Sequence, residues 1–534
     1  MYDLEYMKVL AAKGKVSRRE FVQFSLASGV TLAAAQAMFT TAVRAEPQSG
    51  GHLRMGLAHG HTNDTLDPAY WPDTSTQVMF WGNLSNSLTQ VDEKGEIVMD
   101  LVEEMEPSNG TATWAFKLRQ GVTFHDGKPL TPEDVLASYN HFMKEDSESP
   151  MKSVLASVME IKADGPDMVI FELDGGNADF PYLVSDYKAP IMPANADGTA
   201  DWQSGNRTGA FKLESWEPGI VGRFVRNENY HFEGRPYVES CEVRSLTDVT
   251  ARTNALTTGE IDWMARPDLK TLSLLERDPN IEITEVTGYA HYVLPMLMDV
   301  APFDDNNVRL AIKHCIDRDE IVAKVFLGHG TVGNDNPIPP NVKFAIDPEP
   351  RHVYDPEKAK HYLEQAGLSS LTVDLHVSDA AFDGAVDVAQ LVRESASKCN
   401  IEVNVVREPE DGYWTNVWGV KPWSASYWSG RPTIDWMFST AYQSGSSWNE
   451  NHQSIPHFDD LLVAARAETD ETKRAEMYAE MQQIVHDDGG QIVLIFNSII
   501  AANTTSLAHG EIAGNWEVDG LRLAEKWWFV EPEA

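Results

Sequence analysis

The chain has 534 residues, 43 lysines and arginines against 81 aspartates and glutamates, and a formal net charge of -38. At roughly 100 to 200 residues per domain, this length predicts two to four packed units. So large a surplus of carboxylates repels phosphate backbones and anionic lipid surfaces, which excludes nucleic-acid and membrane-surface partners. The three cysteines are widely separated, which excludes a local disulfide framework and a Cys-x-x-Cys metal site: Cys241, Cys315 and Cys399.

The first 45 residues have the order of an export signal. Arg18 and Arg19 precede a weakly apolar run from Leu26 to Phe39, and a small residue, Ala45, stands at the expected cleavage point. This order predicts a twin-arginine signal and a mature protein in a bacterial periplasm. A chance arginine pair before a core helix is the alternative. No later apolar run approaches ~18 residues, so we expect no direct membrane insertion.

The mature chain begins with a strand and a capped helix. A strand is expected over 52–57, followed by a polar loop from Ala58 to Pro72 that is rich in turn residues. Thr131 then opens a helix, because Pro132 suits the first turn and Asp134 completes a capping box.

The second half of the chain alternates helices and strands. Apolar residues between Val308 and Cys315 fall on one face of a helix, and a further helix opens at Asp355 and stops at Gly367. Alternation predicts strands over 371–377 and 401–405, with a helix over 388–399 between them. This βαβ unit implies a parallel sheet covered by helices. A last helix over 474–486 and a strand over 492–496 follow.

Four stretches resemble the solute-binding proteins of dipeptide, oligopeptide, nickel and opine ABC importers, which form family 5 of these proteins (cluster C). Each motif is weak alone, but their order along nearly the whole mature chain is specific. The stretches run from Phe124 to Val135, from Gly209 to Tyr230, from Pro302 to Arg318 and from Tyr354 to Lys360.

The resemblance implies an α/β, two-lobed periplasmic-binding-protein fold with a hinged cleft and an extra subdomain on the first lobe. We expect lobe I over 46–88, 205–290 and 490–534, the subdomain over 89–204, and lobe II over 291–489. It also implies the function: a monomer captures a small organic solute by lobe closure and delivers it to ABC permease and ATPase subunits. No catalytic residue, metal ligand or cofactor is expected.

Six of the fifteen tryptophans lie between Tyr413 and Trp448, which makes this region a candidate cleft wall. Core positions are expected for Trp414, Trp418 and Trp436. Trp428 ends a strand-like stretch with Tyr427 and enters a turn, where ligands gather in α/β folds. We therefore assign Trp428, Tyr427 and Trp448 to the ligand site. The six tryptophans are Trp414, Trp418, Trp423, Trp428, Trp436 and Trp448.

Arg431 is the central candidate of the ligand site. Many peptide-binding relatives have an acidic residue in this turn, which is thought to hold the ligand's ammonium group, whereas this chain reads Gly430-Arg431-Pro432. A guanidinium there favours a carboxylate or phosphate, so among peptide-like and opine-like solutes a carboxylate-bearing one is favoured over a peptide with a free N-terminus. Two alternatives stay open: Asp435 has taken over the amine, or Asp435 pairs with Arg431 and pins the turn.

Two histidines complete the candidate set. His59 lies with His61 and Asp64 in the loop after the first strand, where imidazoles and a carboxylate suit nickel but are also ordinary loop residues. His291 lies near the expected crossing segment and suits the ligand site, the hinge or the core.

Other function classes remain as alternatives. A nickel or metallophore carrier of the same fold is one alternative, and an exported hydrolase is another. The hydrolase is disfavoured because the sequence has no HExxH, GxSxG or Walker motif.

Overall fold

The computed structural model describes residues 7, 21, 22, 24, 25, 47–409 and 412–530. The predicted export signal, including Arg18 and Arg19, falls almost wholly outside this range and stays a prediction. Among the described residues, every helix is too short or too polar to cross a lipid bilayer.

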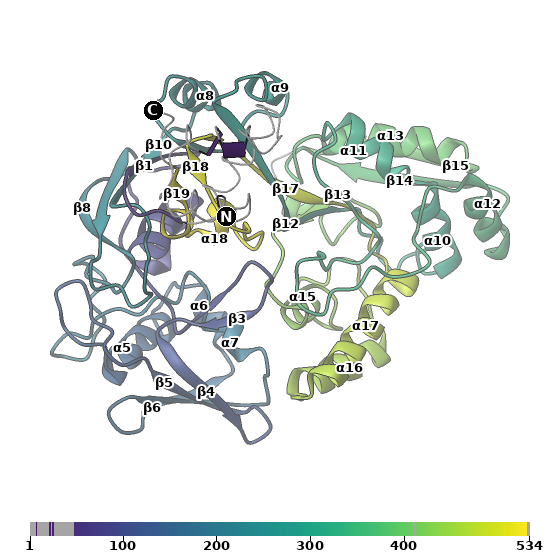
Figure 1. Ribbon diagram of the computed structural model, residues 1–534. Coiled ribbons are helices and arrows are strands. Elements are labelled where there is room, and N and C mark those ends of the chain that lie inside the picture. The colour runs from purple at the N-terminus through teal and green to yellow at the C-terminus, as the bar shows by residue number, and fades with distance from the viewer. Residues whose placement is uncertain (1–6, 8–20, 23, 26–46, 410–411, 531–534) are drawn as a thin grey trace.

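Two long antiparallel strands run between two bodies of the molecule (Figure 1). These are β12 (Ile281–Val293) and β17 (Val493–Thr504), which pair along most of their length with a register shift between Thr287 and His291. The pair lies within a nine-stranded mixed sheet that continues into both bodies. The two crossing strands therefore have the position that a hinge requires.

The first body is built on the five strands that lie beyond β17 in this sheet, from β11 (Trp263–Ala265) to β8 (Phe211–Glu217). β1 is paired in parallel with β10 and β11 on its two sides, and its apolar residues Leu53, Met55 and Leu57 are fully buried. Besides β12 and β17, the strands of the sheet are β1 (His52–Leu57), β8 (Phe211–Glu217), β9 (Val221–Arg226), β10 (Ser240–Ser245), β11 (Trp263–Ala265), β13 (Thr331–Val332) and β16 (Ser426–Trp428). Short helices cover it, among them α8 (Val249–Thr257), α9 (Leu272–Leu275) and α19 (Leu523–Lys526).

A separate antiparallel sheet with its own core lies below the first body in Figure 1. Its helix, α5 (Pro132–Met143), begins with the predicted capping box: Thr131 and Asp134 bond reciprocally, which confirms that helix start. The core cluster of this region runs from Leu88 to Trp202. The predicted lobe and subdomain boundaries stay predictions. The strands are β4 (Val102–Ser108), β5 (Thr113–Leu118), β7 (Met168–Leu173) and β6 (Val158–Ala163).

The second body contains the predicted βαβ unit. β14 (Leu371–Val377) and β15 (Ile401–Arg407) pair in parallel, and α13 (Ala385–Ser397) connects them, which confirms the unit. Within the described residues these two strands form a sheet of their own, and the next segment adds a single bridge from Ser424 to His376. The predicted helices are α10 (Asn306–Cys315), α12 (Pro356–Gln365) and α17 (Glu471–Asp488), and α11 (Arg318–Lys324) follows α10.

Contacts join the second body to the segment that precedes α7 (Phe180–Leu183). Asp179 forms a buried ion pair with Arg474 of α17 at 2.8 Å, and the backbone N–H of Ala178 donates to the carbonyl of Arg466 at 2.7 Å. Arg466 belongs to α16 (Pro456–Ala467), which packs beside α15 (Ile434–Ala441) and α17. These contacts bring residues from distant parts of the chain to one cavity.

Candidate functional site

A cavity of about 660 Å³ lies between segments that are far apart in the sequence. Its size suits a small organic molecule. The walls combine aromatic rings with three charged side chains. The charged and aromatic residues are Asp186, Tyr187, Lys188, Arg431, Trp436, Trp448 and Trp516, and α6 (Met151–Val154) adds Met151 and Val154.

Arg431 lines this cavity from a turn that is anchored on the crossing strand. In β16, Trp428 pairs with His291 of β12. The chain then turns at Gly430, which has φ 77° and packs so closely on Tyr289 that a Cβ would lie 2.3 Å from the tyrosine Cβ. Only glycine fits both conditions without strain. The turn therefore holds the backbone of Arg431 in a fixed position at the cavity wall.

The Arg431 guanidinium has no carboxylate partner among the described residues. Its Nη1 donates to the carbonyl of Gly430 at 2.6 Å and to Ser429 Oγ at 3.3 Å, and its carbon lies 5.8 Å from the Trp428 ring centroid and 6.0 Å from that of Trp436. Burial lowers the pKa of Arg431. The charge of Asp186 acts on Arg431 through space, but without a direct salt bridge the guanidinium has donors left for an anionic ligand.

Another part of the cavity wall carries Asp186, Tyr187 and Lys188, which the sequence analysis missed. Asp186 Oδ1 accepts from the backbone N–H of Lys188 at 2.8 Å, and Lys188 Nζ lies 5.4 Å from the Tyr187 ring centroid. Burial raises the pKa of Asp186 and lowers that of Lys188. Neither side chain forms an ion pair within the described part of the chain. With Arg431, the cavity therefore has an excess of one positive charge.

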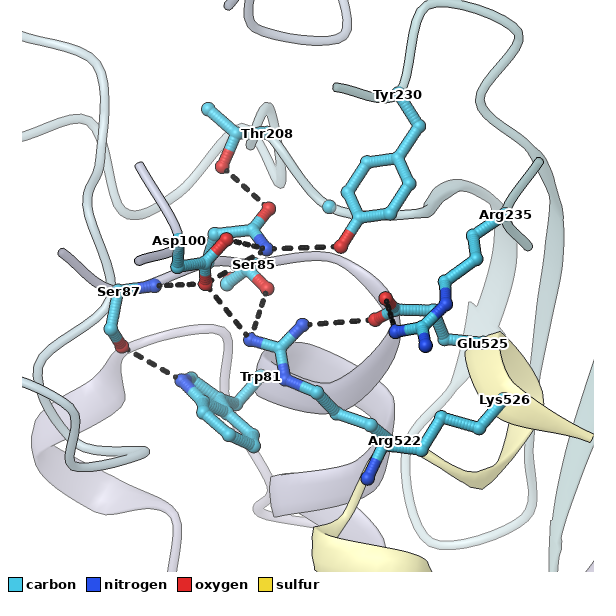
Figure 2. Close-up of polar contacts among 12 residues, drawn as sticks. Trp81, Ser85, Ser87, Asp100, Thr208, Tyr230, Arg235, Arg522, Glu525 and Lys526 are labelled. Atoms are coloured by element: carbon cyan, nitrogen blue, oxygen red, sulfur yellow. Dashed lines mark hydrogen bonds and ion pairs between the residues drawn. The ribbon is translucent and has the colours of Figure 1, made fainter. Parts of the chain in front are cut away.

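A buried polar network lies beneath this wall, and Figure 2 shows its core around Arg522. Arg522 donates to Glu525 at 3.2 Å and lies 3.6 Å from Asp100, while its guanidinium carbon lies 4.1 Å from the Trp81 ring centroid. Trp81 donates to Ser87 Oγ, and Ser87 Oγ donates to the carbonyl of Asp186 at 3.3 Å. The network therefore fixes the segment that carries this part of the wall.

Of the predicted aromatic site residues, only Trp448 lines the cavity, with half of its side chain exposed. Trp428 is buried, and its indole N–H donates to Glu450 at 2.7 Å instead of facing a ligand. Tyr427 points the other way along β16 and contacts Trp414. The core prediction is wrong for Trp414, which is 41% exposed, and for Trp436, which is half-buried and lines the cavity.

Asp435 does not pair with Arg431. It accepts from Arg466 Nε at 3.0 and 3.2 Å, and it lines a neighbouring cavity of about 530 Å³. Burial raises the pKa of Asp435 to about 6 despite this partner. The reason for the difference is topological: α16, which carries Arg466, packs directly beside α15.

The two predicted histidines, His59 and His291, do not line this cavity. His59 contacts Arg266 at 3.2 Å, while His61 lies 3.5 Å from Asp73. His291 is fully buried, its Nδ1 lies 3.2 Å from the carbonyl of Tyr289, and burial lowers its pKa to about 4. Within the described ranges, the group of side chains spaced for a metal ion is instead His352, His486 and Asp487, outside the cavity.

Comparisons with known proteins point in one direction. The model of the bacterial extracellular solute-binding proteins, family 5 Middle, matches residues 96–450. The chain is 25% identical over 522 residues to the oligopeptide-binding protein AppA of Bacillus subtilis (strain 168), covering 91% of this chain and 93% of that protein.

Solved structures share the fold. HbpA2 from Haemophilus parasuis superposes with a TM-score of 0.78 at 20% identity, covering 88% of this chain and 99% of the other. AgaA from A.tumefacien, solved in complex with agropinic acid, superposes with a TM-score of 0.68 at 21% identity, covering 90% and 99%. The fold is therefore that of two-lobed periplasmic binding proteins.

Proposed function

The chain belongs to the bacterial extracellular solute-binding proteins of family 5, and on that premise we propose that it captures an organic solute bearing a carboxylate. The solute lies in the cavity beside Arg431, and closure of the two bodies around it presents the loaded form to an ABC importer. Relatives solved as ABC-transporter-associated binding proteins support the delivery step. The protein acts as a monomer outside the cytoplasmic membrane, after twin-arginine export.

The observation that carries the proposal is the unpaired Arg431 guanidinium in the cavity wall. Its planar fork suits two parallel hydrogen bonds to a carboxylate. Lys188 adds a second unpaired cation to the same cavity, so an anion is favoured over an amine. The structure of AgaA with agropinic acid supports an acidic solute in this family. No bond of the solute is broken, and we assign no catalytic residue.

Nickel carriage is less well supported. A relative is solved with Ni(L-His)2, but in the described part of this chain the group spaced for a metal ion, which includes His352 and His486, does not line the cavity.

The test starts from the solute that the protein retains. Native mass spectrometry of protein purified from its own periplasm identifies the bound molecule, and calorimetry then measures its affinity for variants. Arg431→Ala should weaken binding by about 10- to 100-fold, since a hydrogen bond to a charged group contributes about 1.5–3 kcal/mol. The affinity of Arg431→Lys should lie between those of the wild type and Arg431→Ala, because lysine keeps the positive charge but lacks the planar fork of donors.

The matched control is Arg407→Ala on β15. This arginine does not line the cavity; its side chain is 71% exposed, and its nearest charged partner, Asp379, lies 3.6 Å away. This change should leave the affinity unaltered. Equal affinity of wild type and Arg431→Ala would remove Arg431 from the site and with it the proposal of an acidic solute.

A further inference from the structure

Five aromatic side chains form a continuous contact from the cavity to the outer surface. We call this set the ring ladder: Trp414, Trp418, Tyr427, Trp428 and Trp448. Trp448 contacts Trp428 at 5.9 Å and Trp418 at 6.4 Å between ring centroids. Trp418 contacts Trp414 at 6.0 Å, and Trp414 contacts Tyr427 at 5.7 Å.

The ladder exposes much more ring surface than a core would. Trp448, Tyr427 and Trp414 are 50%, 47% and 41% exposed. Single exposed aromatic residues are ordinary, but a contiguous group of them marks a binding surface. Since Trp448 also lines the cavity, this surface is continuous with the proposed solute site.

A buried carboxylate positions the ladder. Glu450 is 3% exposed and accepts hydrogen bonds from the indole N–H groups of Trp418 and Trp428 and from Gln491 Nε2 at 2.8 Å. Burial raises the pKa of Glu450, and no cation pairs with it among the described residues. A carboxylate without a counter-ion is unfavourable in a core. Here it orients the two indoles on which Trp448 rests.

Arg431 and Trp448 both contact the ring of Trp428. The Arg431 guanidinium carbon lies 5.8 Å from the Trp428 centroid, and the Trp448 ring lies 5.9 Å from the same centroid. Both residues line the cavity, so one small solute can touch both. Further rings of the wall, Tyr187, Trp436 and Trp516, give the cavity flat apolar surfaces on several sides.

We propose that Arg431 and Trp448, the member of the ring ladder that lines the cavity, form one binding surface for a carboxylate solute that carries a planar aromatic group. The carboxylate meets Arg431, and the aromatic group stacks on Trp448. Glu450 acts as a positioning residue for this stack. The inference rests on the proposed function and narrows its substrate class.

Two probes of equal charge and carbon skeleton test the inference: naphthylacetate, and decahydronaphthylacetate, which lacks the planar rings. Calorimetry should give about tenfold tighter binding of naphthylacetate, because ring stacking adds up to that factor beyond area burial. Trp448→Ala should abolish this preference, and Trp448→Phe should keep most of it. Leu274→Ala, which truncates a 60% exposed side chain on α9, should leave the preference unchanged.

Glu450→Gln removes the buried charge and one of the two indole acceptors. It should lower the preference for the aromatic acid while leaving affinity for the saturated acid unchanged, a result that a purely structural role of Glu450 would not give. A retained preference in this variant would overturn its positioning role.

The outcomes separate the inference from the proposed function. Equal affinity for the two acids in the wild type, or a preference that survives Trp448→Ala, overturns the aromatic class but not carboxylate capture. Binding of neither acid also overturns the inference, whereas the proposed function fails only if Arg431→Ala leaves binding of the co-purified solute intact. If the ring ladder contacts only the permease, Trp448→Ala should lower uptake in cells without changing the affinity for either acid. That result likewise overturns the inference.

Discussion

The ion pair between Asp179 and Arg474 should set the balance between open and closed forms. Asp179 lies in the predicted subdomain and Arg474 in the predicted second lobe, 2.8 Å apart, and each side chain is only 9% exposed. Asp179→Asn keeps an acceptor but removes the charge. Replacing a charge-assisted hydrogen bond by a neutral one, with Arg474 left buried, should cost about 2 kcal/mol.

We expect Asp179→Asn to destabilise the closed form, because the ion pair joins the predicted subdomain to the predicted second lobe. Affinity for the co-purified solute should then drop about thirtyfold in calorimetry. Small-angle scattering of the solute-free variant should give a larger radius of gyration than the wild type. The control is Glu96→Gln, which removes a pair between the same parts: Lys343 and Glu96 are 2.8 Å apart with side chains 22% and 46% exposed.

Since an exposed pair contributes at most about 1 kcal/mol, Glu96→Gln should change the affinity less than about fivefold. Equal effects of the two substitutions, or an unchanged affinity in Asp179→Asn, would refute the idea that burial of this pair stabilises closure.

Three further predictions concern stability and export. Asp335 is fully buried and lies 2.6 Å from Arg318, so Asp335→Asn should lower the free energy of unfolding in urea by about 3–5 kcal/mol, and a near-wild-type midpoint would contradict this. His291 has its pKa lowered to about 4, so its neutral form stabilises the fold above pH 6.5. That contribution, about 3 kcal/mol, should be lost as the pH falls from 6.5 to 4, and the loss should be absent in His291→Leu. Replacing both Arg18 and Arg19 with lysine should leave the protein in the cytoplasm on cell fractionation, and periplasmic protein would refute the export signal.

Local elements were predictable from the sequence because their signals are local. The capping box at Thr131 and the alternation from Leu371 to Val377 depend on residues within a few positions of one another, and both are found in the structure. The width of the parallel sheet was not predictable. It depends on which distant segment pairs next to β14, and there only Ser424 forms a bridge.

The site divides in the same way. Arg431 and Trp448 were chosen as candidates because their segment is unusual in itself, with a cation in the turn and dense tryptophans, and both line the cavity. Asp186 and Lys188 were missed because no pattern marks them, and only the tertiary fold brings them to the same cavity as Arg431. The alternative in which Asp435 pairs with Arg431 was wrong for the same reason: its partner, Arg466, is distant in sequence but lies on the neighbouring helix.

A crystal structure of the protein with its co-purified solute would show directly whether Arg431 holds a carboxylate. We expect an intact solute between the two bodies, with a carboxylate within hydrogen-bond distance of the Arg431 guanidinium. A solute bound elsewhere, a solute without an anionic group at Arg431, or a chemically altered molecule would contradict this expectation.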